Sequence, residues 1–102
     1  MQTAIPSTSL SFQVLELAAS VLRILGHPQR LRMIELLSAG PMTVSQLTQE
    51  LGLAQNAVSQ HLNLMKTRGI LSSRRYGRTV RYQIVHPQAR TVLGCIRRNA
   101  SD

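Results

Sequence analysis

Residues 54–68 separate amide side chains from apolar ones when they are wound as a helix at about 100° per residue. The apolar face consists of Ala54, Ala57, Val58, Leu62, Leu64 and Met65. The opposite face consists of Gln55, Asn56, Ser59, Gln60, Asn63 and Lys66, with no carboxylate in the segment. Amides can donate and accept hydrogen bonds at base edges, whereas a carboxylate would repel phosphate. The polar face is therefore predicted to enter the major groove of DNA.

Basic residues concentrate around the end of this segment and just beyond it. The chain has 102 residues, with twelve Lys and Arg against four Asp and Glu, and a formal net charge of +8. Half of the basic residues lie between positions 66 and 81, and no acidic residue occurs between Glu50 and Asp102. This asymmetry favours a polyanionic partner, and a solvated basic face is the alternative. The predicted DNA contacts are Thr43, Gln55, Asn56, Ser59, Gln60, Asn63, Lys66, Arg74, Arg75, Arg78 and Arg81.

Apolar periodicity and turn residues predict the elements that position these side chains. A capping-box pattern at Thr43 and Gln46 starts a short helix, and Gly52 supplies the turn into the next, which makes a helix-turn-helix. The expected helices span 12–25, about 28–38, about 44–51, 54–68 and about 87–98. Two strands are expected over 71–76 and 79–85, around Gly77 and Arg78.

The order of these elements, α-α-α-α-β-β-α, predicts a mainly α chain with a small β-hairpin, a winged helix-turn-helix. Residues 1–10 are expected to form a flexible N-terminal arm. Residues 11–98 are expected to form one domain for DNA binding and dimerisation, followed by a tail over 99–102. With no Trp and few aromatics, the core of that domain must be aliphatic.

Several functional classes are disfavoured by what the sequence lacks. A single cysteine, Cys95, excludes an internal disulfide framework and an intrachain multi-thiolate metal site. Neither a signal-peptide pattern nor an apolar run of ~20 residues is present, so we expect a cytoplasmic protein with no membrane span. Without a Ser/His/Asp grouping or a phosphate-binding glycine loop, neither an enzyme nor a bound cofactor is expected.

Three stretches resemble, in this order, the ArsR/SmtB family of small bacterial repressors. They are LGHPQRLRMIELL (25–37), TVSQLTQELGLAQNAVSQHLNLMKTRGIL (43–71) and SRRYGRTVRYQI (73–84). The resemblance implies a homodimer whose two recognition helices read an inverted repeat in an operator, and which leaves the DNA when it meets an inducer. The metal-sensing motifs of that family, a Cys-x-Cys or paired ligands on the last helix, are missing. We therefore expect no transition metal as direct inducer, and the effector stays unidentified.

The first and last helices are predicted to supply the dimer interface, because the DNA-reading parts do not use them. The predicted interface residues are Leu15, Ala18, Leu22, Val92, Leu93 and Ile96. Cys95 borders the same stripe, where it acts either as a small hydrophobe or in a redox or metal-related role across the interface.

Some side chains keep two interpretations. His61 lies within the apolar arc of its helix, so it either packs against the second helix or contacts DNA. Arg30 and Arg32 either pair with Glu35 or touch the DNA backbone. His27 is expected to cap the second helix, and His86 begins the last one.

Two other functions fit a winged helix. One is a protein-interaction module, which the amide face and basic hairpin disfavour because dry protein interfaces use apolar and aromatic anchors. The other is non-specific binding of nucleic acid by the basic hairpin alone. Comparing affinity for a defined inverted repeat with affinity for random duplex separates them.

Overall fold

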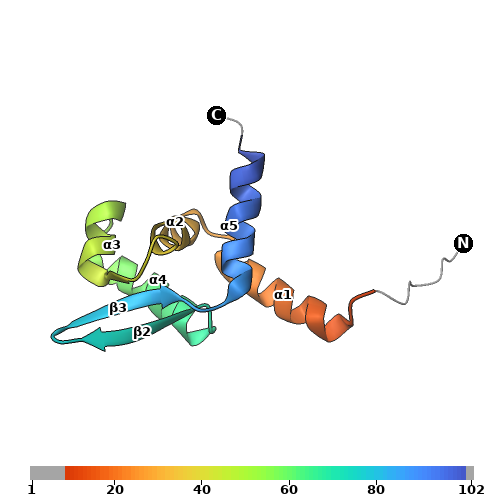
Figure 1. The fold of residues 1–102 in the computed structure, drawn as a ribbon, viewed down its shortest axis with the longest axis horizontal. Coiled ribbons are helices and arrows are strands. Elements are labelled where there is room, and N and C mark those ends of the chain that lie inside the picture. The colour runs from red at the N-terminus through yellow and green to blue at the C-terminus, as the bar shows by residue number, and fades with distance from the viewer. Residues whose placement is uncertain (1–8, 101–102) are drawn as a thin grey trace, which may run out of the picture.

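The computed structural model describes residues 9–100, so most of the expected N-terminal arm and part of the tail lie outside the described residues. The order of the elements confirms the predicted mainly helical fold with a small hairpin (Figure 1). The helices are α1 (Phe12–Leu25), α2 (Pro28–Leu37), α3 (Val44–Leu51), α4 (Gln55–Thr67) and α5 (Pro87–Asn99). The strands are β1 (Met42–Thr43), β2 (Leu71–Tyr76) and β3 (Thr79–Ile84).

Two helices begin at a histidine followed by a proline. The Nδ1 atom of His27 accepts a hydrogen bond from the backbone N–H of Gln29 at 3.1 Å, and that of His86 accepts one from Gln88 at 3.2 Å. The proline that follows has no N–H. This costs nothing, because the first turn of a helix leaves its N–H groups without a partner within the helix. The expectation that His27 caps α2 is confirmed, and His86 begins α5 in the same way.

The capping box of α3 is present as predicted. The Thr43 hydroxyl accepts from the Gln46 backbone N–H at 3.1 Å, and the Gln46 side chain accepts from the Thr43 backbone N–H at 2.9 Å. Gly52, with φ of 68°, ends α3 in the left-handed conformation that glycine adopts without steric cost. Ala54, the N-cap of α4, makes no side-chain capping bond.

The sheet has three strands rather than the two that were predicted. Its order is β1-β3-β2 with antiparallel pairing, and Met42 and Thr43 lie opposite Tyr82 and Arg81. A two-residue strand is too short to show a periodic pattern, which is why the sequence did not reveal β1. The pairing ties the start of α3 to the hairpin, so the helix-turn-helix and the β2–β3 hairpin share one framework.

An aliphatic core joins α2, α3, α4 and the sheet. Its fully buried members include Met33, Ile34, Leu37, Leu47, Val58, Leu62, Met65 and Ile70. Among residues 9–100, every buried residue is hydrophobic. The core therefore holds α4 by apolar packing on one side and leaves the other side of that helix free.

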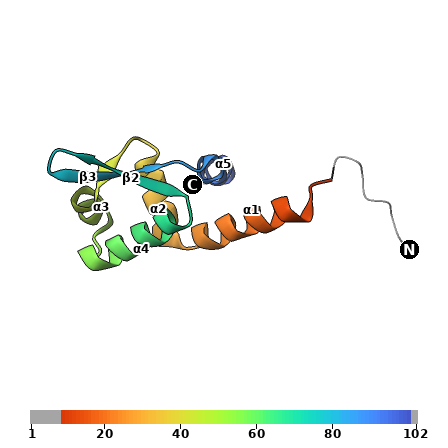
Figure 2. The same ribbon diagram turned by 90° about the horizontal axis from the view of Figure 1, so that it is seen from below.

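Helix α1 contributes little of its length to this core. In both views it projects from the body at the end opposite the hairpin tip (Figures 1 and 2). Only Val21, Ile24 and Leu25, near its C-terminal end, are buried, whereas Leu15 and Leu22 are 46% and 48% exposed. Most of the helix thus presents apolar side chains that this protomer does not cover.

Candidate nucleic-acid interface

Helix α4 shows the division into two faces that its sequence predicts. Val58, Leu62 and Met65 are fully buried and anchor it against the core. Ala54 is an exception on the apolar side, because as the exposed N-cap it lies outside the buried face. Of the polar face, Ser59 is half-buried and the rest are exposed, namely Gln55, Asn56, Gln60, Asn63 and Lys66. Amide groups therefore lie on a rigid helix with their hydrogen-bonding atoms open to a partner.

Lys66 connects this helix to the hairpin. Its Nζ donates to the Ser73 hydroxyl on β2 at 2.8 Å, and both side chains are at or near the surface. The contact fixes the C-terminal end of α4 against β2. The polar face of α4 and the basic hairpin therefore have a defined relative position.

The hairpin carries four exposed arginines. Arg74 and Arg81 are cross-strand partners, whereas Arg75 lies opposite Val80 on the other face. Arg78 lies at the tip beside Gly77, whose φ of 62° permits the tight turn. Together they make an exposed basic projection at the end of the molecule remote from α1 (Figure 1).

Tyr76 belongs to this arrangement, and sequence analysis missed it. The guanidinium carbon of Arg81 lies 4.9 Å from the centroid of the Tyr76 ring, and that of Arg74 lies 6.0 Å away. A cation over an aromatic ring is attracted to it. The alternation of β2, which places residues 74 and 76 on one face, was the available signal.

Thr43 has a structural task in addition to its predicted role in binding. Its half-buried side chain accepts the capping bond at the start of α3. A hydroxyl can also donate, so the cap leaves its proton available to a phosphate.

Of the side chains with two interpretations, His61 packs near α2 and Arg32 makes the expected pair with Glu35. His61 lies against the α2 region, with its Nδ1 3.3 Å from Arg30 Nη1 and its ring 4.7 Å from that of His27. Burial, followed by the charges of His27 and Arg30, lowers the pKa of His61 below its ordinary value of 6.5. Arg32 pairs with Glu35, whereas Arg30 does not.

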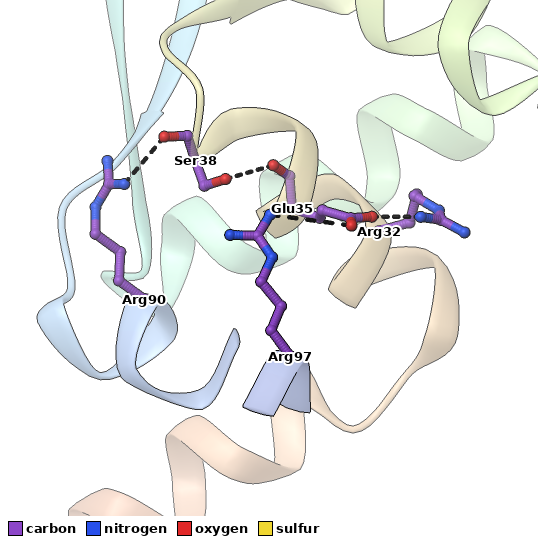
Figure 3. A network of polar contacts seen from close by, with 5 residues as sticks. All are labelled: Arg32, Glu35, Ser38, Arg90 and Arg97. Carbon is purple, nitrogen blue, oxygen red and sulfur yellow. Dashed lines mark hydrogen bonds and ion pairs between the residues drawn. The ribbon is translucent and has the colours of Figure 1, made fainter. Parts of the chain in front are cut away.

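A second polar network joins α5 to the C-terminal end of α2 (Figure 3). Arg90 Nη1 donates to the Ser38 carbonyl at 3.3 Å, and Arg97 Nη2 lies 4.0 Å from Glu35 Oε2. The Ser38 hydroxyl donates to the Glu35 carbonyl at 2.6 Å. The network fixes α5 against the helix that precedes the helix-turn-helix.

The predicted interface residues divide into exposed and buried groups. Leu15, Leu22 and Ile96 are more than 40% exposed, and Ala18 and Val92 are half-buried. Leu93 is only 6% exposed because α5 turns it into the core of its own protomer. Its placement at a dimer interface therefore has to be corrected, since an amphipathic stripe does not specify which partner covers it.

Cys95 is exposed, and Asn99 Nδ2 donates to its carbonyl oxygen at 2.8 Å. Nowhere in the described part of the chain do three or more His, Cys, Asp or Glu side chains gather closely enough to hold a metal ion. Among residues 9–100, no helix combines the length and apolarity that crossing a membrane requires.

Comparison with known proteins places this geometry in a family. Residues 27–73, which include α2, the helix-turn-helix and the start of β2, match the model of bacterial regulatory proteins of the arsR family. The nodulation protein NolR of Rhizobium meliloti is 32% identical over 81 residues, covering 79% of this chain and 66% of NolR. This chain thus spans just under two thirds of that relative.

Two further comparisons cover a larger share of the known protein. The HTH-type transcriptional regulator YgaV of Escherichia coli K12 is 32% identical over 83 residues, covering 80% of this chain and 84% of YgaV. The homodimeric winged helix-turn-helix DNA-binding domain Mb0332 of Mycobacterium bovis superposes with a TM-score of 0.74 at 21% identity. That superposition covers 90% of this chain and 87% of Mb0332, and it shows the fold. The chain has a winged helix-turn-helix fold and belongs to the ArsR/SmtB family of bacterial regulatory proteins.

Proposed function

We propose that this chain is a sequence-specific DNA-binding transcriptional repressor that acts as a homodimer on an inverted-repeat operator. The observation that carries the proposal is the face of α4, where exposed amides and a hydroxyl lie on a helix anchored by Val58, Leu62 and Met65. Amides can pair with adenine in the major groove. Lys66 is the only charged side chain on this face, so no carboxylate there would repel the phosphates that border the groove.

The hairpin supplies the second part of the proposed contact. Exposed Arg74, Arg75, Arg78 and Arg81 give charge without sequence preference, which raises affinity for any duplex and sets the register of the protein on it. The Lys66–Ser73 bond at 2.8 Å fixes this basic projection relative to α4. A groove-reading helix and a phosphate-binding hairpin therefore act as one unit.

One such unit covers a half-site, so two copies related by a twofold axis would read an inverted repeat. The exposed apolar side chains Leu15 and Leu22 on α1 and Ile96 on α5 are the proposed interface. The homodimeric Mb0332 domain has the same fold, which supports this assembly. We further propose that an unidentified signal releases the dimer from its operator in the cytoplasm.

The direct test is selection of duplexes from a random pool by the purified full chain. We expect enrichment of an inverted repeat whose half-sites are about one helical turn apart, centre to centre. Affinity is then compared between that sequence and a scrambled duplex at the same salt concentration, because the phosphate contribution depends on salt. Equal affinity for both would contradict specific recognition and leave non-specific binding. Absence of binding to either would favour a protein-interaction module.

A further inference from the structure

Three helices meet at the side chain of Arg30. From α2, its Nε donates to the Ile24 carbonyl in the last turn of α1 at 2.6 Å. Its Nη1 lies 3.3 Å from Nδ1 of His61 on α4. The His27 ring at the N-cap of α2 lies 4.7 Å from the His61 ring with an interplanar angle of 62°. One guanidinium thus joins α1 and α4 through α2.

The chemistry of the two groups fixes the direction of the second bond. A guanidinium has only donors, so Nδ1 of His61 must accept, and the neutral ring must carry its proton on Nε2. The Ile24 carbonyl is one of the last carbonyls of α1, which have no partner within the helix. Arg30 therefore satisfies an acceptor on each of the two helices that it joins.

This contact differs in kind from the apolar contacts that hold α4. The helix packs mainly against α3 and β2, through apolar side chains such as Leu62 and Met65 whose attraction does not depend on direction. A hydrogen bond does depend on direction. His61 directly follows Gln60 of the exposed face, so its bond fixes the rotation at which that face is presented.

We propose that Arg30 and His61 are positioning residues, which set the recognition helix α4 relative to the dimerisation helix α1. The inference rests on the proposed function and adds the means by which two recognition helices keep one spacing. The partner copy would be joined through α1, and Arg30 transmits the orientation of α1 to α4. Neither residue needs to touch DNA for this role.

The charges around the junction give the proposal a pH dependence. His27 and Arg30 face His61, and both disfavour its protonated form. The ionisable groups on the other two elements packed against α4 are Glu50 on α3 and Arg74, Arg75 and Tyr76 on β2, none of which contributes to that effect. Protonation would remove the Nδ1 acceptor and place a second cation beside Arg30. At acidic pH the bond between Arg30 and His61 is therefore expected to be lost, and α4 would no longer be held in one orientation.

The test compares binding of the selected operator with binding of a scrambled duplex at about pH 8, where histidine is neutral. Arg30→Ala and His61→Ala should each weaken operator binding about tenfold and change scrambled-duplex binding less than about twofold. The double variant should lose no more than Arg30→Ala alone, because that variant already removes the bond to His61. Arg32→Ala, which removes an arginine from the same helix, is the matched control and should keep the parent's ratio of operator affinity to scrambled-duplex affinity.

His61→Asn separates positioning from packing, because the amide oxygen of asparagine can accept near the place of Nδ1. It should recover operator affinity to within about threefold of the parent, and the recovered binding should depend less on pH below about 6.5 than that of the parent. Full additivity of the two alanine variants, or equal losses on both duplexes, would overturn the inference. So would an asparagine variant as weak as the alanine one.

Nitrogen NMR of the His61 ring tests the junction without DNA. We expect an unprotonated Nδ1 and a protonated Nε2 at about pH 8, with a change in the Nδ1 signal in Arg30→Ala but not in Arg32→Ala. A ring protonated on Nδ1, or one unaffected by the loss of Arg30, would overturn the inference. If the parent protein selects no sequence, the proposed function fails while this measurement still decides whether the junction exists.

Discussion

Arg74 and Arg81 lie directly opposite each other across the β2–β3 hairpin, and the ring of Tyr76 lies beside both guanidinium groups. Like charges in cross-strand positions destabilise a hairpin, whereas attraction to the ring opposes this effect. A phosphate between the two arginines would remove the remaining repulsion. We therefore expect the hairpin to bind an anion with little rearrangement.

Replacing Tyr76 with leucine should weaken binding to operator and random duplex alike. Leucine keeps apolar bulk but removes the ring that holds Arg74 and Arg81, and an exposed cation–π contact is worth about 0.5–1 kcal/mol. We expect a loss of up to about fivefold in affinity, measured by fluorescence anisotropy at two salt concentrations. Tyr76→Phe keeps the ring and is the control. Equal binding by the two variants would show that the ring is not needed.

Gln60→Ala tests base recognition. Because Gln60 is exposed on the polar face of α4, the substitution should cost about 1–3 kcal/mol at the operator and leave random duplex almost unchanged. Arg78→Ala should instead weaken both duplexes and reduce the slope of affinity against salt by about one unit. If Gln60→Ala produced equal losses on both duplexes, Gln60 would not read bases.

The two caps of the helix-turn-helix should respond in opposite directions. Thr43→Ala removes the capping bond at 3.1 Å and should lower the free energy of unfolding by about 1 kcal/mol. Ala54→Ser introduces a hydroxyl at an N-cap that has no side-chain bond, and should raise it by about 0.5–1 kcal/mol. Urea denaturation measures both, with Ser45→Ala inside α3 as a control. A neutral Thr43→Ala would mean that the capping box adds no stability.

Local chemistry explains how much of this fold the sequence could predict. The capping box at Thr43 and the division of α4 depend on neighbours within one or two turns, and both are present in the structure. Strand β1 depends on pairing between Met42 and Tyr82, which are far apart in the chain. Leu93 shows the same limit, because periodicity marks a side chain as covered without saying whether its own core or a second copy covers it. The Arg30 junction likewise required three helices to be placed in space.

Stability should fall as the solution becomes more acidic than about pH 6.5, partly through His61. Its pKa is lowered in the folded protein by burial, His27 and Arg30, so the unfolded chain binds more protons in the window below 6.5. The free energy of unfolding is therefore highest above that pH and decreases as pH falls. Urea denaturation across this range should show a smaller decrease for His61→Asn. Identical pH profiles for the parent and His61→Asn would show that protonation of His61 does not contribute to the loss of stability.

The last prediction concerns assembly, and burial in the protomer decides which substitutions can test it. Leu15 and Ile96 are 46% and 44% exposed, so aspartate at either position should leave the fold intact. Burying these side chains at an interface removes apolar surface from water, and a charge there would oppose it. We expect Leu15→Asp and Ile96→Asp to convert a dimer to a monomer in sedimentation experiments and to abolish operator binding at the same time.

Two controls separate dissociation from unfolding. Gln13→Asp adds the same charge at another exposed position of α1 and should remain dimeric. Leu93→Asp places a carboxylate in the protomer core, where the leucine is 6% exposed, and should unfold the chain rather than dissociate it. Circular dichroism distinguishes these outcomes. A parent protein that sediments as a stable monomer at tens of micromolar and still binds a full operator tightly would contradict the dimer, because pairing would then require DNA.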